Sequence, residues 1–450
     1  MQGERSNFAA FFEGIMAYKA YITKISVSDH PDPEVHSIAV GSANGNTVVV
    51  SKKTQTGDLG IYFECDGQLS LEFAKANDLV RYKDPVTGEN KGGFFDDNRK
   101  VRAQKFRGVK SDGFWIPVES LGFTGTDISA LKEGDSFDEL NGIPICNKFV
   151  TRATQKAANK EKKQRREEKF VINLPKHFDT AQFRNEAKLY KAGDVIYLSE
   201  KKHGTSQRLG CIEVQHIYRK FSFKWLKQKL GLLPQKTFEN VIGTRNVTLD
   251  PIDEKKNEGK GYYADESFRQ KVCKDLFGKL RKNEILFFEV VGWINEATPI
   301  MPPADIKALK EKSLKKYADK DGKMFYSYGA NVGQCKMYVY RIANMQSDGK
   351  LVDMPFSYVI ERCKELEVET VPLLCDPFIY DGDVRTLQNL VEGLTDGECS
   401  IDSRHIREGV CVRADRYPTP FVTKNKSFFF KLCEGMVKEN EDYVDTEEAA

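Results

Sequence analysis

A lysine followed three residues later by a glycine is the pattern in this chain that could carry nucleophilic chemistry. It occurs four times, in the pairs Lys105–Gly108, Lys110–Gly113, Lys201–Gly204 and Lys256–Gly259. The amine of a lysine becomes a nucleophile when burial or neighbouring cations disfavour its proton. A glycine close by lets the backbone approach a phosphate. Because the pattern is short, the surrounding residues must decide which copy is functional.

The residues around Lys201 favour this copy of the pattern. The apolar segment 195–200 (VIYLSE) predicts a strand that delivers Glu200 and Lys201 to a loop. Small and hydroxyl residues follow, and Arg208 adds a cation that disfavours the ammonium form of the lysine. Lys256 lies in the polar sequence DEKKNEGKGYY with no apolar strand before it. We therefore interpret Lys256 as part of a surface loop.

The first third of the chain is expected to consist of short strands. Residues 17–150 alternate β-branched or aromatic runs with turn clusters of Gly, Asn and Asp. The runs are AYITKISV, SIAVGS, NTVVVSK, LGIYFEC and FWIPV. One short helix is expected around Leu69–Asp78. Many short strands in a domain of this size predict a compact barrel or sandwich, and an OB-like barrel is one option.

Strands and helices are mixed after residue 170. We expect strands at Val195–Leu198, Ile285–Trp293, Met337–Ile342 and Gly409–Arg413. We expect helices at Ser222–Leu230, Ser267–Leu280, Pro303–Tyr317 and Val384–Leu394. This mixture, with its long connections, fits an α+β catalytic domain of roughly 270 residues.

Two charged segments flank this second part. Residues 152–170 hold eight basic and three acidic side chains and almost nothing apolar, which is typical of a solvated helix or linker. Contact with a nucleic-acid backbone is an equally supported interpretation of this segment. Carboxylates crowd the end of the chain, and we interpret residues 439–450 as an acidic, solvated tail.

Six segments in order resemble the motifs of covalent nucleotidyl transferases, and specifically those of ATP-dependent RNA ligases. EKKHGTS (Glu200–Ser206) resembles motif I, and GTRNV (Gly243–Val247) resembles the phosphate-contacting motif Ia. FFEVVG (Phe287–Gly292) and MYVYRI (Met337–Ile342) are similar to motifs III and IIIa. EGVCVR (Glu408–Arg413) and TKNKS (Thr423–Ser427) are similar to motifs IV and V. His203 stands where DNA ligases and capping enzymes usually carry Asp, and the KSDG sequence at Lys110 fits motif I but lies outside this order.

The N-terminal part resembles one branch of these enzymes. FECDGQLSLEFAKANDLVR and NRKVRAQKFRGVKSDGFWIPV are similar to the N-terminal OB domain of the Naegleria-type RNA ligases. The resemblance implies an α+β nucleotidyltransferase (ATP-grasp-like ligase) domain preceded by an all-β OB-fold domain. The expected parts are an OB-fold domain at 1–150, a basic linker at 151–170, an adenylyltransferase domain at 171–438 and the tail at 439–450. Lys224–Gln235 and Met301–Asp321 have no counterpart, and we interpret them as insertions.

The resemblance implies that Lys201 attacks the α-phosphate of ATP and forms a lysyl-AMP intermediate. The AMP then passes to an RNA 5′-phosphate, and a 3′-hydroxyl attacks the activated end, which seals the strand and releases AMP. Glu289 and Glu408 would hold a divalent metal, Mg²⁺ or Mn²⁺, that offsets phosphate charge. Lys424 and Lys426 fall on one face of an extended segment and would contact the α-phosphate as pyrophosphate leaves.

The resemblance also implies a set of nucleotide-binding residues. Tyr340 would stack on adenine, although an aromatic residue in such a strand also suits a core. Arg208 and Arg245 would contact phosphates through their forked donors, whereas isolated arginines more often form surface ion pairs. His203 would orient a ribose, a phosphate or a metal-bound water. The remaining residues of the predicted set are Glu200 and Gly204.

The expected partner is RNA with 5′-phosphate and 3′-hydroxyl ends. In the first domain, Lys105, Arg107 and Lys110 lie among aromatic residues in a way that suits contacts with an RNA backbone or a triphosphate. The net charge of the chain is only 69 − 66 = +3, but it averages a linker of 8 − 3 = +5 with an acidic tail. We therefore expect RNA binding to depend on the local placement of charge.

Composition limits the class and the compartment of the protein. No run approaches 18 apolar residues, which excludes a spanning helix, and the N-terminus does not have the pattern of a signal peptide. Ten scattered cysteines without a CxxC pair indicate reduced thiols in a cytoplasmic protein. We expect a monomer without a membrane partner.

Two other functions stay open at this point. A DNA ligase or a guanylyltransferase is the nearest enzymatic alternative, and His203 together with the leading OB-like domain argues against both. A catalytically inactive nucleic-acid-binding homologue is the alternative from another class. The presence of the full set of expected catalytic residues argues against it, and these are Lys201, Glu289, Glu408, Lys424 and Lys426.

Overall fold

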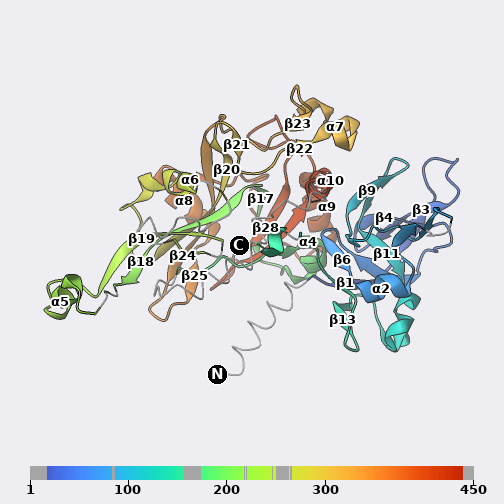
Figure 1. Ribbon diagram of the computed structural model, residues 1–450, viewed down its shortest axis with the longest axis horizontal. Coiled ribbons are helices and arrows are strands. Elements are labelled where there is room, and N and C mark those ends of the chain that lie inside the picture. The colour runs from blue at the N-terminus through green and yellow to red at the C-terminus, as the bar shows by residue number, and fades with distance from the viewer. Residues whose placement is uncertain are drawn as a thin grey trace. The chain divides into compact units, whose positions relative to one another are not determined.

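The computed structural model of the 450-residue chain describes residues 18–83, 87–151, 153–156, 174–216, 218, 220–245, 247–249, 263 and 266–438 (Figure 1). Contacts divide the chain into two compact units. The first comprises Met1–Phe149 and Phe428–Met436, and the second comprises Val150–Ser427 and Val437–Ala450. Most of the predicted linker, the whole predicted tail and the Lys256–Gly259 pair lie outside the described residues.

The first unit is built almost entirely from short antiparallel strands. A four-stranded sheet has the order β11 (Phe114–Pro117), β5 (Leu59–Phe63), β1 (Ala20–Lys24) and β12 (Ser136–Phe137). A three-stranded sheet contains β2 (Ser26–Ser28), β3 (Ile38–Ala43) and β4 (Asn46–Ser51). Four strand pairs join β6 (Gly67–Leu69) to β15 (Cys146–Lys148), β7 (Arg81–Lys83) to β8 (Asn90–Gly92), β9 (Ala103–Phe106) to β10 (Val109–Asp112) and β13 (Glu139–Leu140) to β14 (Ile143–Pro144). The strands expected from the five apolar runs are confirmed.

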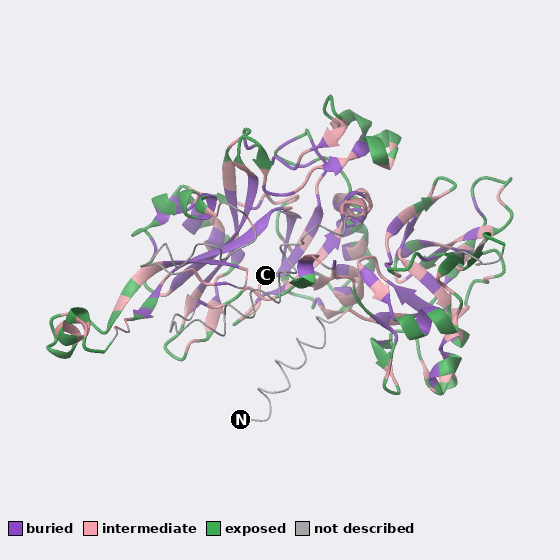
Figure 2. Cartoon of the chain, in the orientation of Figure 1, coloured by how far each residue is buried: buried purple, intermediate pink, exposed green. Residues whose placement is uncertain are grey.

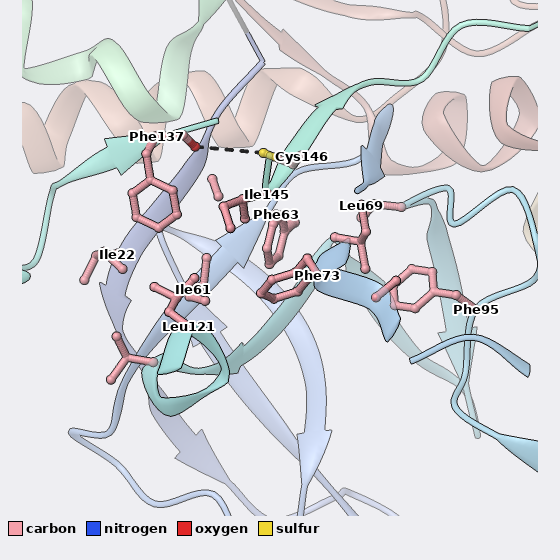
Figure 3. Packing of buried hydrophobic residues seen from close by; sticks show 14 residues of the cluster. Ile22, Ile61, Phe63, Leu69, Phe73, Phe95, Leu121, Phe137, Ile145 and Cys146 are labelled. Atoms are coloured by element: carbon pink, nitrogen blue, oxygen red, sulfur yellow. Dashed lines mark hydrogen bonds between the residues drawn. The ribbon is translucent and has the colours of Figure 1, made fainter. Parts of the chain in front are cut away.

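An aromatic core holds the first unit together (Figure 3). The rings of Phe63 and Phe73 lie 5.3 Å apart, and those of Phe95 and Phe114 lie 4.9 Å apart edge to face. Phe73 comes from α2 (Leu71–Ala76), which begins at Ser70 because that side chain accepts the Phe73 N–H. The expected short helix is therefore confirmed. The described residues of this unit also form the 3₁₀ helices η1 (Val118–Thr124) and η2 (Ile128–Ala130).

Helix α10 (Phe428–Val437) belongs largely to the first unit, although it follows the last strand of the second in sequence. Its Lys431 forms an ion pair with Asp112, and its Gly435 carbonyl accepts a hydrogen bond of 3.1 Å from Lys100. The sequence expectation assigned this segment to the second domain. The three phenylalanines that begin α10 give it an apolar surface, but they do not indicate which unit that surface contacts.

Two sheets form the second unit. The first has the order β16 (Ala181–Gln182), β29 (Phe421–Lys426), β28 (Gly409–Ala414), β17 (Val195–Lys201) and β27 (Phe378–Ile379). The second has the order β19 (Lys236–Thr244), β18 (Thr205–Gln215), β20 (Glu284–Asn295), β24 (Cys335–Met345) and β25 (Leu351–Asp353). Strands β21 (Thr298–Pro299) and β26 (Glu369–Thr370) add to this sheet, and β22 (Ala304–Asp305) pairs with β23 (Lys323–Met324). The four strands expected in this part are confirmed.

Helices pack around these sheets. The longer ones are α8 (Phe356–Leu366), which the sequence analysis missed, and α9 (Val384–Thr395), which it predicted. Leu387 and Val391 of α9 pack on Ile196, Val410 and Val412 of the five-stranded sheet. The short helices are α4 (Phe183–Glu186), η3 (Ala187–Leu189), α5 (Phe223–Lys229), α6 (Ser267–Lys271), η5 (Lys274–Leu276), α7 (Ile306–Leu309) and η6 (Lys312–Tyr317).

Two of the predicted helices are divided in the structure. The helix expected at Ser267–Leu280 consists of α6 and η5, and the one expected at Pro303–Tyr317 consists of α7 and η6. Lys310 interrupts the second pair because it adopts a left-handed conformation, with φ of 56°. All ten cysteines are free thiols. Among the described residues, no helix has the length and apolar content needed to span a membrane.

Candidate active site

Lys201 ends strand β17 next to a buried carboxylate. Its Nζ lies 2.8 Å from Oε1 of Glu408, and Nζ of Lys426 lies 3.7 Å from the same oxygen. The strand register explains this meeting, since Gly409 on β28 is paired with Lys201 on one side and with Lys426 on the other. The Glu408 side chain is only 2% exposed. Two ammonium groups therefore converge on one buried carboxylate, and they compensate the cost of burying its charge.

The alternation of strands β17, β28 and β29 separates a polar face from the core. Ser199, Cys411 and Lys424 are paired across the three strands, one step before the row that contains Lys201. Side chains two residues apart in a strand share a face, so Lys424 and Lys426 both lie on the face of Lys201. The alternate residues of β17 and β28 point to the opposite face, where Ile196, Leu198, Val410 and Val412 lie in the core. Burial raises the pKa of the Cys411 thiol to about 11, so Cys411 is neutral on this face.

The seven-stranded sheet contributes a second group of side chains. Glu289 on β20 is paired with Ser206 on β18, and Ser206 Oγ lies 2.9 Å from the hydroxyl of Tyr340 on β24. The Glu289 residue is 8% exposed. Burial raises the pKa of Tyr340, so its hydroxyl stays protonated and can donate a hydrogen bond. Glu289 and Tyr340 therefore place a carboxylate and an aromatic ring in the same region.

A histidine from the segment before β16 lies against Tyr340. The His177 ring centroid is 5.1 Å from that of Tyr340, and its Nδ1 is 3.2 Å from Nη1 of Arg341. A guanidinium only donates hydrogen bonds, so Nδ1 must carry the lone pair. Burial, together with the charge of Arg341, lowers the pKa of His177 well below 6.5. His177 is therefore neutral at physiological pH.

One cavity of the second unit joins these groups. Its lining includes Lys201, Glu289, Tyr340 and Lys424. Arg245, directly after β19, also lines it and forms an ion pair with Asp179. A concave site with convergent cations and aromatic rings suits a ligand that carries both phosphates and an aromatic base.

Glu289 and Glu408 were the expected metal ligands. The described residues contain no group of three or more His, Cys, Asp or Glu side chains able to hold a metal ion. Carboxylate oxygens are nevertheless the donors that Mg²⁺ and Mn²⁺ prefer, and Mg²⁺ commonly takes one or two protein carboxylates and completes its shell with water and substrate phosphates. The two glutamates fit such an ion, provided that other ligands come from a phosphate and from water.

Solved structures of Naegleria gruberi RNA ligase match the chain over nearly its whole length. A variant with AMP and Mn has a TM-score of 0.52 and 15% sequence identity, and the match covers 94% of this chain and 99% of that chain. The ligase with PPi matches with a TM-score of 0.51, 15% identity and the same coverage. The chain has the fold of this RNA ligase. No protein-family model matches the sequence, and a search of curated proteins found no match either.

Two glycines are required where the RNA ligase fold brings strands close together at the site. A Cβ on Gly204 would lie 2.3 Å from the Val290 carbonyl oxygen and 3.0 Å from Cγ of Glu289. A Cβ on Gly409 would lie 2.1 Å from the Asn425 carbonyl oxygen. Gly204 therefore lets β18 begin directly beside Glu289. This packing role differs from the close phosphate approach that the sequence analysis suggested.

Glu200 lies on the core side of β17 in the RNA ligase fold. Its carboxylate forms an ion pair of 3.2 Å with Lys202, and both side chains are at most 1% exposed. It also accepts a hydrogen bond of 2.8 Å from the Ser400 N–H. Lys202 lies over the rings of Tyr328 and Tyr338. Glu200 thus joins β17 to the segment around Ser400 through buried contacts.

His203 and Arg208 are not brought to the cavity wall. The His203 ring stacks edge-on against Tyr326 at 4.9 Å. Arg208 is fully buried, and its guanidinium donates to the carbonyls of Thr244 at 2.8 Å and Val247 at 3.4 Å. It also donates to two carbonyls at 2.8 Å, those of Leu174 and Pro175. Arg208 therefore holds the chain that presents Arg245.

Lys110 of the KSDG sequence lies in the first unit, on strand β10. Its Nζ is 5.0 Å and 4.4 Å from the ring centroids of Phe428 and Phe429 on α10. Lys105 on the neighbouring strand β9 also lies over Phe429, at 5.3 Å. Both lysines therefore contact α10 through cation–π interactions. Arg107 is exposed in the β9–β10 turn.

Several cavity residues were missed by the sequence analysis. His177 and Asp179 lie before β16 in a segment without a recognised motif. Arg341 is next to Tyr340, and it forms a buried ion pair with Asp353. Arg413 lies within the EGVCVR segment, two residues after Cys411, so strand alternation could have assigned it to the same face. No comparable signal pointed to His177.

Proposed function

We propose that the chain is an ATP-dependent RNA ligase that joins RNA 3′-hydroxyl and 5′-phosphate ends. One observation carries the proposal, namely that Lys201, which lines the cavity, meets Glu408 and Lys426, and that the three come from segments in the order of the ligase motifs. The fold of the chain supports the same conclusion. Lys201 is the proposed nucleophile because it ends a strand beside this charge cluster.

We assign the first unit as an OB-fold domain and the second as the adenylyltransferase domain, an ATP-grasp-like ligase fold. The many short antiparallel strands of the first unit support the former assignment. The two sheets that carry the six motif segments support the latter. In this proposal residues 151–170 remain a basic linker and residues 439–450 an acidic tail.

In the first step, Lys201 Nζ attacks the α-phosphorus of ATP and pyrophosphate leaves. An ammonium group has no lone pair, so Lys201 must first release its proton to water, and the positive charge of Lys426 and of a metal held by Glu408 would disfavour the ammonium form. The N–P bond of lysyl-AMP forms as the bond to the pyrophosphate oxygen breaks. Lys424, Lys426 and Arg245 neutralise phosphate charge during this displacement.

ATP and a divalent cation are the proposed cofactors. Solved structures of the Naegleria gruberi ligase contain ATP and Mn in one variant and AMP and Mn in another. Glu289 and Glu408 would hold the metal, which offsets negative charge on the α-phosphate. Tyr340 and the neutral His177 would contact the base, since their rings meet at 5.1 Å in the cavity.

The later steps transfer AMP to an RNA 5′-phosphate and then release it as the 3′-hydroxyl attacks. RNA is the proposed partner, with further contacts from Lys105, Arg107 and Lys110 on the first unit. Of the predicted nucleotide-binding set, His203 would orient a ribose, a phosphate or a metal-bound water. Glu200, Gly204 and Arg208 would hold the chain segments that form the site. We further propose a cytoplasmic monomer.

Covalent labelling tests the first step. The protein is incubated with ATP labelled at the α-phosphate and a divalent metal, and then separated on a denaturing gel. We expect a labelled protein band that is absent in Lys201→Ala and present in Lys110→Ala. Lys110 is a matched control because it has the same local pattern but contacts α10. Loss of the band in Lys110→Ala alone would overturn the assignment of the nucleophile.

Nucleotide and substrate choice separate the remaining functions. A band with labelled GTP and none with ATP indicates a guanylyltransferase, and no band with either indicates an inactive nucleic-acid-binding homologue. If ATP labels the protein, a panel of nicked duplex, single-stranded and stem-loop RNAs is tested beside the same DNA strands. We expect sealing of RNA ends, and sealing of DNA alone contradicts the proposal.

A further inference from the structure

The hairpin of β18 and β19 carries a helix at its tip. The two strands pair as far as Gln215 and Lys236, and α5 lies between them. Figure 1 shows α5 at the far end of this hairpin, away from the other labelled elements of the second unit. We call residues 220–236 the arm. No residue of α5 is buried, and Figure 2 shows the tip mainly as exposed.

The arm exposes a group of large apolar side chains. The most exposed are Phe221 at 88%, Phe223 at 71%, Leu232 at 67%, Leu230 at 65% and Leu226 at 48%. Phe223, Leu226 and Leu230 are spaced at i, i+3 and i+7, so they share one face of the helix. Single exposed apolar residues are ordinary, but five of them between residues 221 and 232, three on one face of a helix, indicate a binding surface.

The other side of the helix attaches it to the hairpin. Gln228 Nε2 donates to the carbonyls of His216 at 3.0 Å and Pro234 at 3.4 Å. Ser222 caps the helix by accepting the Trp225 N–H at 3.1 Å, and the Trp225 ring lies 5.4 Å from that of Phe221. These contacts preform the helix and fix which face points outward.

The charge of the arm has one sign. It contains five lysines and no aspartate or glutamate, and the lysines are Lys220, Lys224, Lys227, Lys229 and Lys236. Lys227 Nζ lies 4.6 Å from the ring centroid of Phe223, so a cation borders the apolar face. Lys236, at the base, is paired with Glu213 of β18. The outer part of the arm thus combines apolar and cationic groups.

We propose that the arm binds the surface of an anionic lipid membrane. Apolar side chains on one face of a helix enter the boundary between head groups and acyl chains, while flanking lysines contact anionic head groups. RNA would also attract the lysines, but leucine side chains have no π-face on which a base can stack, so Leu226, Leu230 and Leu232 would gain little. A second copy of the arm would bring five lysines against five others. The proposal departs from the expectation of no membrane partner and does not depend on the proposed ligase activity.

Vesicle sedimentation tests the proposal with the full chain. The protein is mixed with vesicles of phosphatidylcholine alone or with about one third phosphatidylserine. We expect binding to the anionic vesicles that is at least about tenfold stronger than to the neutral ones. The double variant Leu226→Ser/Leu230→Ser and the charge variant Lys224→Glu/Lys229→Glu should each lose most of this binding. Ile379→Ser is the matched control, since Ile379 is 73% exposed on β27 outside the arm.

Three results would overturn the proposal. The first is that the protein binds neither kind of vesicle. The second is that the arm variants bind anionic vesicles as strongly as the unsubstituted protein. The third is that Ile379→Ser loses as much binding as the arm variants. A loss of affinity for single-stranded RNA in the arm variants, without vesicle binding, would assign the arm to RNA instead. Thermal melting confirms that the variants fold, and covalent labelling by ATP should be unchanged in them. That readout keeps a failure of the arm proposal separate from a failure of the proposed function.

Discussion

Arg208 and Arg245 have the same side chain but opposite surroundings. Arg208 is fully buried and donates to four backbone carbonyls, whereas the Arg245 side chain is 25% exposed at the cavity. The sequence analysis expected both as phosphate contacts, because Arg245 lies in the segment that resembles motif Ia and Arg208 follows the segment that resembles motif I by two residues. Burial distinguishes a positioning residue from one that can reach a ligand.

We expect substitution of these arginines to separate stability from activity. Arg208→Ala leaves four carbonyl groups without their donor, so it should lower the free energy of unfolding by about 3 kcal/mol or more. Arg245→Ala removes an ion pair with an exposed partner, which contributes at most about 1 kcal/mol, but it should slow covalent labelling by ATP about tenfold. Denaturant unfolding and labelling rates measure the two effects. A stable Arg208→Ala protein with slow labelling would contradict this division.

The strand elements show which parts of the site can be predicted from sequence. Along β17, Ile196, Leu198 and Glu200 alternate with Tyr197, Ser199 and Lys201, so the pattern of two could have assigned Glu200 to the face opposite Lys201. Helix α8 could also have been predicted from sequence, because its apolar residues follow a helical repeat. These residues, which are buried in the structure, are Phe356, Val359, Cys363 and Leu366. His177 could not be found in this way, because its position depends on tertiary packing against Tyr340 and Arg341.

At the level of elements, a substitution where β18 begins beside β20 tests whether the site depends on the close packing of these two strands. Gly204→Ala would place a Cβ 2.3 Å from the Val290 carbonyl oxygen and 2.8 Å from Cγ1 of Val291. The strands must separate beside Glu289, so we expect a loss of about 1–3 kcal/mol in the free energy of unfolding and slower labelling by ATP. Thermal melting and labelling rates measure these changes.

Gly393 in α9 supplies the matched control for this substitution. An added Cβ there meets nothing within 4 Å. Alanine has the higher helix propensity, so Gly393→Ala should stabilise the protein by about 0.5–1 kcal/mol and leave labelling unchanged. Equal effects of the two substitutions would mean that close packing at Gly204 is not important for the site.

For the whole molecule, the net charge of +3 is a poor guide to binding. The cavity places cations from β17, β29 and the end of β19 together, although they are far apart in sequence. Helix α10 is a comparable case, since its contacts with Lys110 and Asp112 join residues more than three hundred positions apart. Sequence patterns predicted the strands with strong apolar runs but missed others, including the long strands β18 and β19. The long-range meetings of residues depend on the fold as a whole.

The stability of the whole chain should fall as the pH decreases from 7 to 5.5. Burial is the main cause that lowers the pKa of both His177 and His405 below 6.5. His405 is fully buried, and its Nε2 accepts the Tyr328 N–H at 3.1 Å, which requires a neutral ring. Above about pH 6.5 both histidines are neutral in the folded and the unfolded chain, so their burial costs no ionisation energy.

Below that pH the unfolded chain takes up protons that the folded chain excludes. The free energy of unfolding should therefore decrease by up to about 2.7 kcal/mol per pH unit for the two residues together. Denaturant unfolding at several pH values measures the slope. We expect a flatter slope in His177→Phe/His405→Gln, because this variant lacks both buried rings. If the double variant kept the original slope, other groups would have to cause the pH dependence.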